Sequence, residues 1–208
     1  VAVLEKSYIG SGAAGRNTTI IRFFFHDPAA AAFYTESVKL YEKLSADLDF
    51  NMMFSQHGHF TLAHSDRSLV VQNERAEVNK LLGIDSRVID RQEVKKLCPQ
   101  IHIGEDVTWP IQGALYHPPG GIIRHDAGVW GYAKQAGRRG VEIHQGVEVT
   151  GFDVRDGKVH GVRTNEGDIS CGTVLSATAG WSTPVAALAG VPLPITGSIL
   201  QAFVTEPV

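Results

Sequence analysis

Apolar residues recur at a helical spacing in several stretches of the chain, which predicts amphipathic helices. The longest covers residues 29–48, and its expected buried face consists of Phe33, Val38, Leu40, Tyr41 and Leu44. Four more helices are expected at 66–84, 90–99, 125–140 and 181–190. Pro99 ends the helix at 90–99, and the helix at 125–140 begins at His125 or Asp126 and is closed by Gly140.

Strand patterns lie between these helices. Strands are expected at VAVLE (1–5), HFTLAH (59–64), ALYHP (114–118), VEIHQ (141–145) and VLSATAG (174–180). The stretch from Val147 predicts short strands around an Asp156-Gly157 turn. This order of strands and helices indicates an α/β protein with a dinucleotide-type sheet that inserted segments interrupt.

Gly10, Gly12 and Gly15 spell the dinucleotide-binding fingerprint G-x-G-x-x-G. That fingerprint requires the glycines to follow a strand directly and to open a helix. Here residues 5–9 separate the apolar run from Gly10, and the segment after Gly15 is β-branched and aromatic. We therefore expect that these glycines are not the first phosphate-binding loop.

Glu5 ends the apolar strand and suggests a different place in the same fold. In dinucleotide-binding domains, an acid at the end of the second strand hydrogen-bonds ribose hydroxyls, about 20 residues after the glycine loop. On this interpretation the chain begins after the true phosphate loop, and Val1 and Val208 look like cuts through a longer chain. A buried strand that ends in a solvated glutamate explains these residues equally well.

Composition narrows the class of protein. The 208 residues suffice for one large or two small domains, and 43% hydrophobic with 20% charged residues is ordinary for a soluble globular protein. A net charge of -3 gives no sign of a nucleic-acid surface, and no apolar run is long enough to span a membrane. Cys98 and Cys171 are isolated, which favours a reducing compartment such as the cytoplasm over a disulfide framework. No metal is expected, because no acid or cysteine completes a ligand set near His57, His59 and His64.

Two segments late in the chain resemble those that complete the nucleotide site in many flavoproteins. The strand backbone at Val149 would hold the adenine edge, and the turn at Ala179-Gly180 would approach the cofactor closely. From the residues alone, an ordinary strand and an ordinary helix start are the simpler interpretation.

Several longer stretches resemble one known family. They are residues 1–22, WPIQGAL (109–115), 121–152 and LPITGSILQAFVTEP (193–207), and they are similar to the β subunits of heterotetrameric sarcosine oxidases, a branch of the D-amino-acid-oxidase-like flavoproteins. The resemblance runs over essentially the whole chain. It implies an FAD-binding domain of the two-dinucleotide-binding, glutathione-reductase-like type, interleaved with a mixed-sheet substrate domain. Residues 1–22 and 119–194 would belong to the FAD-binding domain, 23–118 to the substrate domain, and 195–208 would begin the return to it.

The resemblance also implies an activity and partners. The reaction would be the oxidative demethylation of sarcosine to glycine and a one-carbon unit at the formaldehyde level. Electrons would pass from FAD to a covalent FMN and then to oxygen, forming hydrogen peroxide. Other sarcosine oxidase subunits would be partners, one of them with tetrahydrofolate. Two alternatives stay open: a dehydrogenase of dimethylglycine, another secondary amine or a D-amino acid, and a non-catalytic flavin-binding subunit.

Candidate site residues follow from matching positions in this family. Glu5 resembles the ribose-binding acid, and the segment around the FAD pyrophosphate and flavin would supply Ser11, Gly12, Arg16, Asn17 and Thr18. A guanidinium at Arg16 can offset phosphate charge through paired hydrogen bonds, whereas the plain interpretation is a surface arginine.

Arg22 resembles the arginine that holds the substrate carboxylate in related single-chain enzymes. A structural salt bridge is its alternative role. The family usually continues with small polar residues, whereas Phe23, Phe24, Phe25 and His26 follow here, which puts the substrate in doubt.

His125 matches the histidine that carries covalent FMN through its ring. A helix start suits this chemistry, because the positive end of the helix dipole disfavours a protonated ring and leaves a neutral nucleophile. The alternative is that His125 or Asp126 caps the helix.

Overall fold

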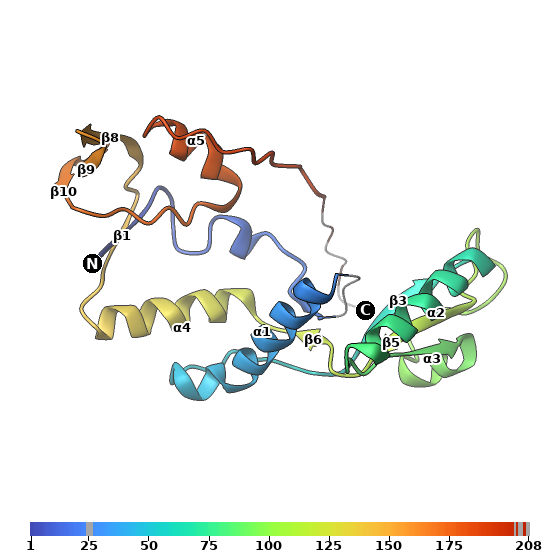
Figure 1. The fold of residues 1–208 in the computed structure, drawn as a ribbon. Helices are drawn as coiled ribbons and strands as arrows, with labels where there is room; N and C mark the ends of the chain where they lie inside the picture. Colours follow the sequence, from blue (N-terminus) through green and yellow to red (C-terminus); the bar gives the residue numbers. More distant parts are fainter. Residues whose placement is uncertain (24–26, 202, 204–205, 207–208) are drawn as a thin grey trace. The chain divides into compact units, whose positions relative to one another are not determined.

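The computed structural model describes residues 1–23, 27–201, 203 and 206. The chain divides into two compact units, one formed by Val1–Thr18 with His125–Val208 and the other by Thr19–Arg124 (Figure 1). The sequence predicted the corresponding divisions after residues 22 and 118, so the structural divisions lie a few residues away. Phe24, Phe25 and His26, which depart from the family's usual pattern after the arginine, lie outside the described residues.

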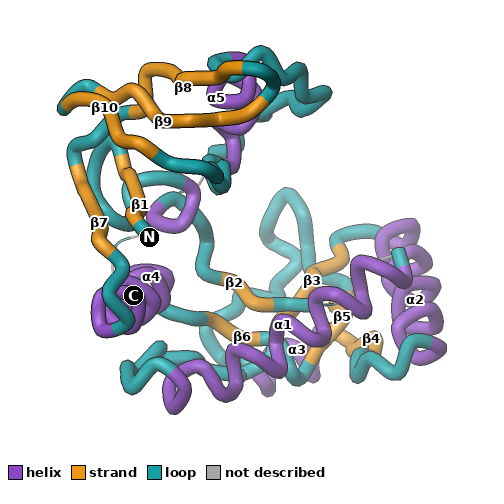
Figure 2. The backbone as a smooth tube through the Cα atoms, turned by 60° about the vertical axis from the view of Figure 1, so that its left-hand side comes forward, coloured by secondary structure: helices purple, strands orange, loops and turns teal. Residues whose placement is uncertain are grey.

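The Thr19–Arg124 unit is built on a three-stranded antiparallel sheet in the order β3-β5-β4. Its strands are β3 (His59–Ala63), β5 (Gly113–His117) and β4 (Arg87–Asp90), and His59 lies opposite His117 in the register. A separate two-stranded ribbon pairs β2 (Ile20–Ile21) with β6 (Gly121–Ile122). Figure 2 shows the two ribbon strands beside each other in this unit. The strand expected at 59–64 is confirmed, and so is the one at 114–118.

Helix α1 (Pro28–Asp47) begins where the sequence predicts, because the Asp27 side chain accepts a hydrogen bond from the Ala30 amide and proline occupies the first turn. Its buried residues are Ala31, Val38 and Leu44. The expected burial of Phe33 and Leu40 is wrong, since they are 71% and 66% exposed. The helix divides its apolar contacts between two clusters: Ala31 and Val38 join one with Leu115, and Leu44 joins another with Met52. Phe33 and Leu40 each stand two positions after Ala31 and Val38, which puts them on the side of the helix opposite the first cluster.

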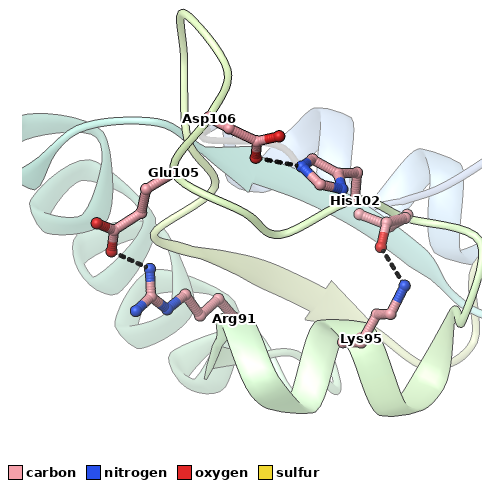
Figure 3. A network of polar contacts seen from close by, with 6 residues as sticks. Arg91, Lys95, His102, Glu105 and Asp106 are labelled. Carbon is pink, nitrogen blue, oxygen red and sulfur yellow. Dashed lines mark hydrogen bonds and ion pairs between the residues drawn. The ribbon is translucent and has the colours of Figure 1, made fainter.

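Helices α2 (Asp66–Leu81) and α3 (Arg91–Leu97) confirm two further predictions. Ser65 forms a capping box with Ser68 at the start of α2, and the Asp90 carboxylate accepts from the Glu93 amide at the start of α3. The loop after α3 forms hydrogen bonds and ion pairs with this helix and within the loop, as Figure 3 shows. Three groups of contacts do this: Arg91 with Glu105 at 2.8 Å, Lys95 with the carbonyls of Pro99 and Ile101 at 2.6 and 2.9 Å, and His102 with Asp106 at 2.7 Å.

The other unit contains a short parallel pair and a meander. Strand β1 (Ala2–Glu5) pairs in parallel with β7 (Glu142–Gln145), and α4 (His125–Arg138) precedes β7 along the chain. The meander has the order β10-β9-β8, with β8 (Val149–Arg155), β9 (Lys158–Thr164) and β10 (Gly167–Ser170). Asp156 and Gly157 join β8 to β9 with φ values of 50° and 71°, the left-handed conformation that a two-residue hairpin turn requires.

The strand expected at VLSATAG (174–180) is wrong. Residues 173–178 form no strand, and Ala179–Trp181 forms a short 3-10 helix, η2. A strand needs a neighbour that exchanges backbone hydrogen bonds, and no described residue pairs with this segment, whose Leu175 is 90% exposed. The helix that follows, α5 (Ser182–Ala187), is present but shorter than predicted. No helix among the described residues combines the length and the apolar character needed to cross a membrane.

Candidate functional site

Glu5 stands at the carboxyl end of β1 and organises the loop that follows it. Its Oε1 accepts hydrogen bonds from the Ser7 amide at 2.8 Å and from the Ser11 hydroxyl at 3.2 Å. Gln145, at the end of β7, accepts from the Ile9 amide at 2.7 Å. Gly10 has a φ of 89°, which only glycine adopts readily. The predicted ribose-binding acid and Ser11 therefore lie within one hydrogen-bonded loop beyond the strand ends.

The glycine segment does not open an α-helix. Ala13–Gly15 forms a single 3-10 turn, η1, and the Asn17 side chain closes it by donating to the carbonyls of Ala13 and Ala14 at 3.2 and 2.6 Å. This confirms that the fingerprint spelling is not a first phosphate loop. Gly12, Arg16 and Thr18 are exposed, and no atom lies within 4 Å of where a Gly12 side chain would begin.

A contact that the sequence did not predict brings η2 to the end of β1. The ammonium of Lys6 lies 3.7 Å from the ring centroid of Trp181, a cation–π arrangement. Because Lys6 follows Glu5 and Trp181 follows Gly180, two predicted cofactor positions lie near each other. Val149 begins β8 opposite Thr164, so it belongs to the meander rather than to the β1–β7 pair.

His125 is the first residue of α4, and α4 packs against η1. Its Nδ1 atom is buried and has no hydrogen-bond partner among the described residues. The Asp126 carboxylate accepts from the next backbone amide, that of Ala127, at 2.9 Å. A buried ring nitrogen without a partner costs free energy, which is typical of a group kept for function. The ring of His125 therefore makes no cap through Nδ1.

Arg22 belongs to the other unit, where it directly follows the ribbon strand β2. Next to it, the ring of Phe23 packs edge-on against His117 at a centroid distance of 4.5 Å. His117 is fully buried, and its Nδ1 lies 2.7 Å from the Asp85 carbonyl. The ribbon approaches His59 as well, since a side chain on Gly120 would come within 2.7 Å of the His59 Cβ. Sequence periodicity gave no sign of this grouping, which depends on the pairing of β3 with β5.

The charges in this group favour neutral imidazoles beside a cation. Burial, the Arg22 charge and His117 lower the pKa of His59 from 6.5 to about 4. Burial also lowers the pKa of His117, and the Asp85 carbonyl partly opposes this. The pKa of Arg75 is lowered by burial and by the nearby charge of Arg22. At neutral pH, His59 and His117 are therefore neutral.

Comparisons with known proteins agree with one another. The family model described as FAD dependent oxidoreductase matches residues 1–208. The chain is 47% identical over 206 residues to a protein of Rhizobium meliloti named sarcosine oxidase subunit beta, covering 99% of this chain and 49% of that protein. A protein of the same name from Arthrobacter sp is 44% identical over 207 residues, with 99% and 51% covered. The chain thus spans about half the length of these curated relatives.

A solved structure shares the same fold. The crystal structure of L-proline dehydrogenase from P. horikoshii superposes with a TM-score of 0.82 at 30% identity, covering 92% of this chain and 49% of that one. The predicted α/β fold of the FAD-binding type is confirmed by this structure and by the family model. Because that model matches the chain from its first to its last residue, the chain belongs to the family of FAD dependent oxidoreductases.

Proposed function

We propose that this chain is part of the β subunit of a sarcosine oxidase that oxidises the N-methyl amine of sarcosine. The full-chain similarity to two proteins of that name supports the proposal. The observation that carries the choice of substrate is Arg22, a guanidinium set at the end of β2 beside neutral His59. A fixed guanidinium pairs with a carboxylate through two hydrogen bonds, which suits an amino acid.

Features of the Val1–Thr18 and His125–Val208 unit fit flavin cofactors. Glu5 and Ser11 lie in one loop at the end of β1, where an acid can accept hydrogen bonds from ribose hydroxyls. The backbone at Gly12 is open on its side-chain side, so a ligand can approach it closely. Arg16 and Thr18 are exposed next to it, and Gly180 is exposed in η2. We assign these residues, with Asn17 and Val149, to FAD binding.

The proposed carrier of covalent FMN is His125. Its Nδ1 is buried, so the ring nitrogen proposed to bond the flavin is Nε2. The ring stands at the amino-terminal end of α4, the positive end of the helix dipole. When bound, FAD would supply the two-electron oxidising chemistry that turns an amine into an imine, and FMN a second redox centre from which oxygen is reduced to hydrogen peroxide.

The residues of this chain have positioning roles in that reaction. Arg22 would hold the carboxylate and so orient the amine and its methyl group. His59 is neutral at the reaction pH and adds no competing charge beside the guanidinium. Hydrolysis of the imine would release glycine and a formaldehyde-level unit, for capture by tetrahydrofolate on a partner subunit. Partner subunits and a cytoplasmic location belong to this proposal.

The proposal is tested on the full-length subunit assembled with its partners. We expect hydrogen peroxide from sarcosine and little from dimethylglycine or a D-amino acid. Faster oxidation of dimethylglycine or of a D-amino acid would establish the dehydrogenase alternative. Flavin binding without oxidation of any of these amines would establish the non-catalytic alternative.

His125→Ala tests the second cofactor separately. We expect covalent FMN to disappear from a denaturing gel while FAD stays bound, because Glu5, Arg16 and Gly180 serve a different flavin. Sarcosine should still reduce the FAD in one turnover, whereas oxygen consumption should fall sharply. Asp126→Asn is the matched control at the same helix start, and it should keep the covalent flavin. Fluorescent flavin on the His125→Ala chain would place the attachment elsewhere.

A further inference from the structure

The loop between α3 and β5 forms hydrogen bonds with neighbouring elements at both of its ends. At its start, Lys95 of α3 donates to two backbone carbonyls of the loop at 2.6 and 2.9 Å (Figure 3). Near its end, the Nδ1 of His64 lies 2.9 Å from the Trp109 carbonyl, and the Gln112 amide donates to the Ala63 carbonyl at 2.8 Å. A loop that is ordered before binding loses little conformational freedom when a partner covers it, which suits recognition.

This loop presents a large apolar side chain to solvent. Trp109 is 72% exposed, and Val107, two positions before it, is also exposed. The carbonyl of Trp109 is the atom that His64 binds, so the backbone is held while the indole ring stays uncovered. The exposed side chains of Glu105 and Asp106 directly precede Val107. The loop therefore carries an exposed aromatic ring close in sequence to two carboxylates.

A hollow of about 880 Å³ opens between the start of α3 and this loop. Its lining includes the ion pair of Arg91 with Glu105, whose nitrogen and oxygen atoms lie 2.8 Å apart. Gln92 and Gln112 add two side-chain amides, which can both donate and accept hydrogen bonds. Trp109 directly precedes two further lining residues, 110 and 111, so the exposed ring and the hollow belong to one surface.

The composition of this surface fits an interface between subunits better than a domain core. Interfaces between subunits are enriched in tryptophan and arginine and have a polar, hydrogen-bonding rim. If the surface were covered as part of a core, Arg91, Glu105 and the two amides would lose water, and that cost is recovered only where new polar partners replace it. Another subunit can supply such partners at its own surface.

We propose that Val107, Trp109 and the adjoining hollow form a docking surface for another subunit of the same enzyme. The surface fits a partner that has an apolar pocket for the Trp109 ring and polar groups that enter the hollow. The partner also places lysine or arginine side chains opposite Glu105 and Asp106, because these carboxylates attract and orient a basic surface. The inference rests on the proposed function for the existence of partner subunits, and the surface itself lies within the Thr19–Arg124 unit.

Photo-crosslinking in the assembled full-length enzyme identifies the chain that covers Trp109. The variant Trp109→p-benzoylphenylalanine carries a photoreactive aromatic side chain at this position, and mass spectrometry identifies the peptide that it captures. We expect a crosslink to a different subunit. The same replacement at Phe33, an aromatic residue of the same unit that is 71% exposed, is the matched control and should capture that subunit far less.

Dissociation on dilution, followed by native mass spectrometry, measures how strongly the surface contributes to assembly. We expect Trp109→Ala to raise the Kd between the subunits at least about tenfold, as the loss of a buried aromatic anchor does. Trp109→Phe keeps an aromatic ring and should lie closer to wild type. Asp106→Asn should slow association at low salt more than at high salt, because salt screens the attraction between exposed charges.

The outcomes separate the inference from the proposed function. A crosslink within the same chain or to a second copy of it would overturn the inference, and so would capture of the partner no stronger than from position 33. An unchanged Kd in folded Trp109→Ala would overturn it as well. If the partner is captured but the enzyme does not oxidise sarcosine, the docking surface stands and the proposed reaction fails. If sarcosine is oxidised but no other subunit is captured, the proposed reaction stands and the inference fails.

Discussion

Gly121→Ala is the substitution whose cost follows most directly from the structure. The added methyl group would lie 2.2 Å from the Ser55 carbonyl oxygen and 2.9 Å from the Gln56 Cα. Both are backbone atoms, so no side chain can turn aside to make room. The two hydrogen bonds that join Ser55 and Ile122, each 2.9 Å long, would have to lengthen.

The expected loss of stability is about 3 kcal/mol. Overpacking costs about 1–3 kcal/mol, and each weakened backbone hydrogen bond costs up to about 1 kcal/mol. Urea unfolding of the full-length protein, followed by intrinsic fluorescence, measures the change. Gly137→Ala in α4 is the control, because nothing lies within 4 Å of the new methyl group and alanine favours a helix by about 0.5–1 kcal/mol.

A functional readout accompanies the stability measurement. Gly121 pairs with Ile21, which directly precedes Arg22, so a displaced ribbon should raise the sarcosine KM. A Gly121→Ala protein that unfolds at the same urea concentration as wild type would refute the close approach of residues 55–56. An unchanged KM in a destabilised variant would show that the ribbon does not set the position of Arg22.

Three further predictions concern single side chains. Arg22→Lys should raise the sarcosine KM in steady-state assays while the flavin content stays constant, because lysine keeps the charge but not the paired hydrogen bonds; unchanged kinetics would leave Arg22 with a structural role. Glu5→Ala should weaken FAD binding in an equilibrium titration, because the Ser7 amide and Ser11 hydroxyl lose their acceptor; wild-type affinity would contradict this. His59 has a folded pKa of about 4, below its ordinary 6.5, so the unfolded chain takes up the proton first and stability falls as the pH drops through this range. At about pH 5 this loss is at most about 2 kcal/mol before solvent screening, and His59→Gln should remove it from a urea unfolding series; equal pH dependence in both proteins would refute the assigned pKa.

Local sequence patterns predicted most of the helices and strands. The turn at Asp156-Gly157 was predicted, and the structure adds the cap at Asp27 and the capping box at Ser65; all three are signals that act within a few residues. The wrong strand at 174–180 shows the limit of such signals, because a strand exists only with a partner that hydrogen-bonds to it.

The candidate site residues likewise divide into those that sequence patterns suggested and those that only the structure groups together. The resemblance suggested Glu5, Ser11 and His125 as candidates, and the structure adds the loop bonds of Glu5 and the buried Nδ1 of His125. The grouping of Arg22 with His59 and Arg75 could not be predicted, because it comes from the pairing of β3 with β5 and from the packing of α2. The spacing of residues along the chain predicts neither the strand pairing nor the helix packing.

Anaerobic rapid mixing of the full-length enzyme with sarcosine tests the central claim most directly. The account predicts that the absorbance of the oxidised flavin falls within a single turnover. At a low sarcosine concentration, this reduction should be slower in Arg22→Lys than in wild type. No reduction by sarcosine, with full reduction by dimethylglycine or a D-amino acid, would contradict the proposed substrate. No reduction by any of these amines would contradict the assignment of amine oxidation to this protein.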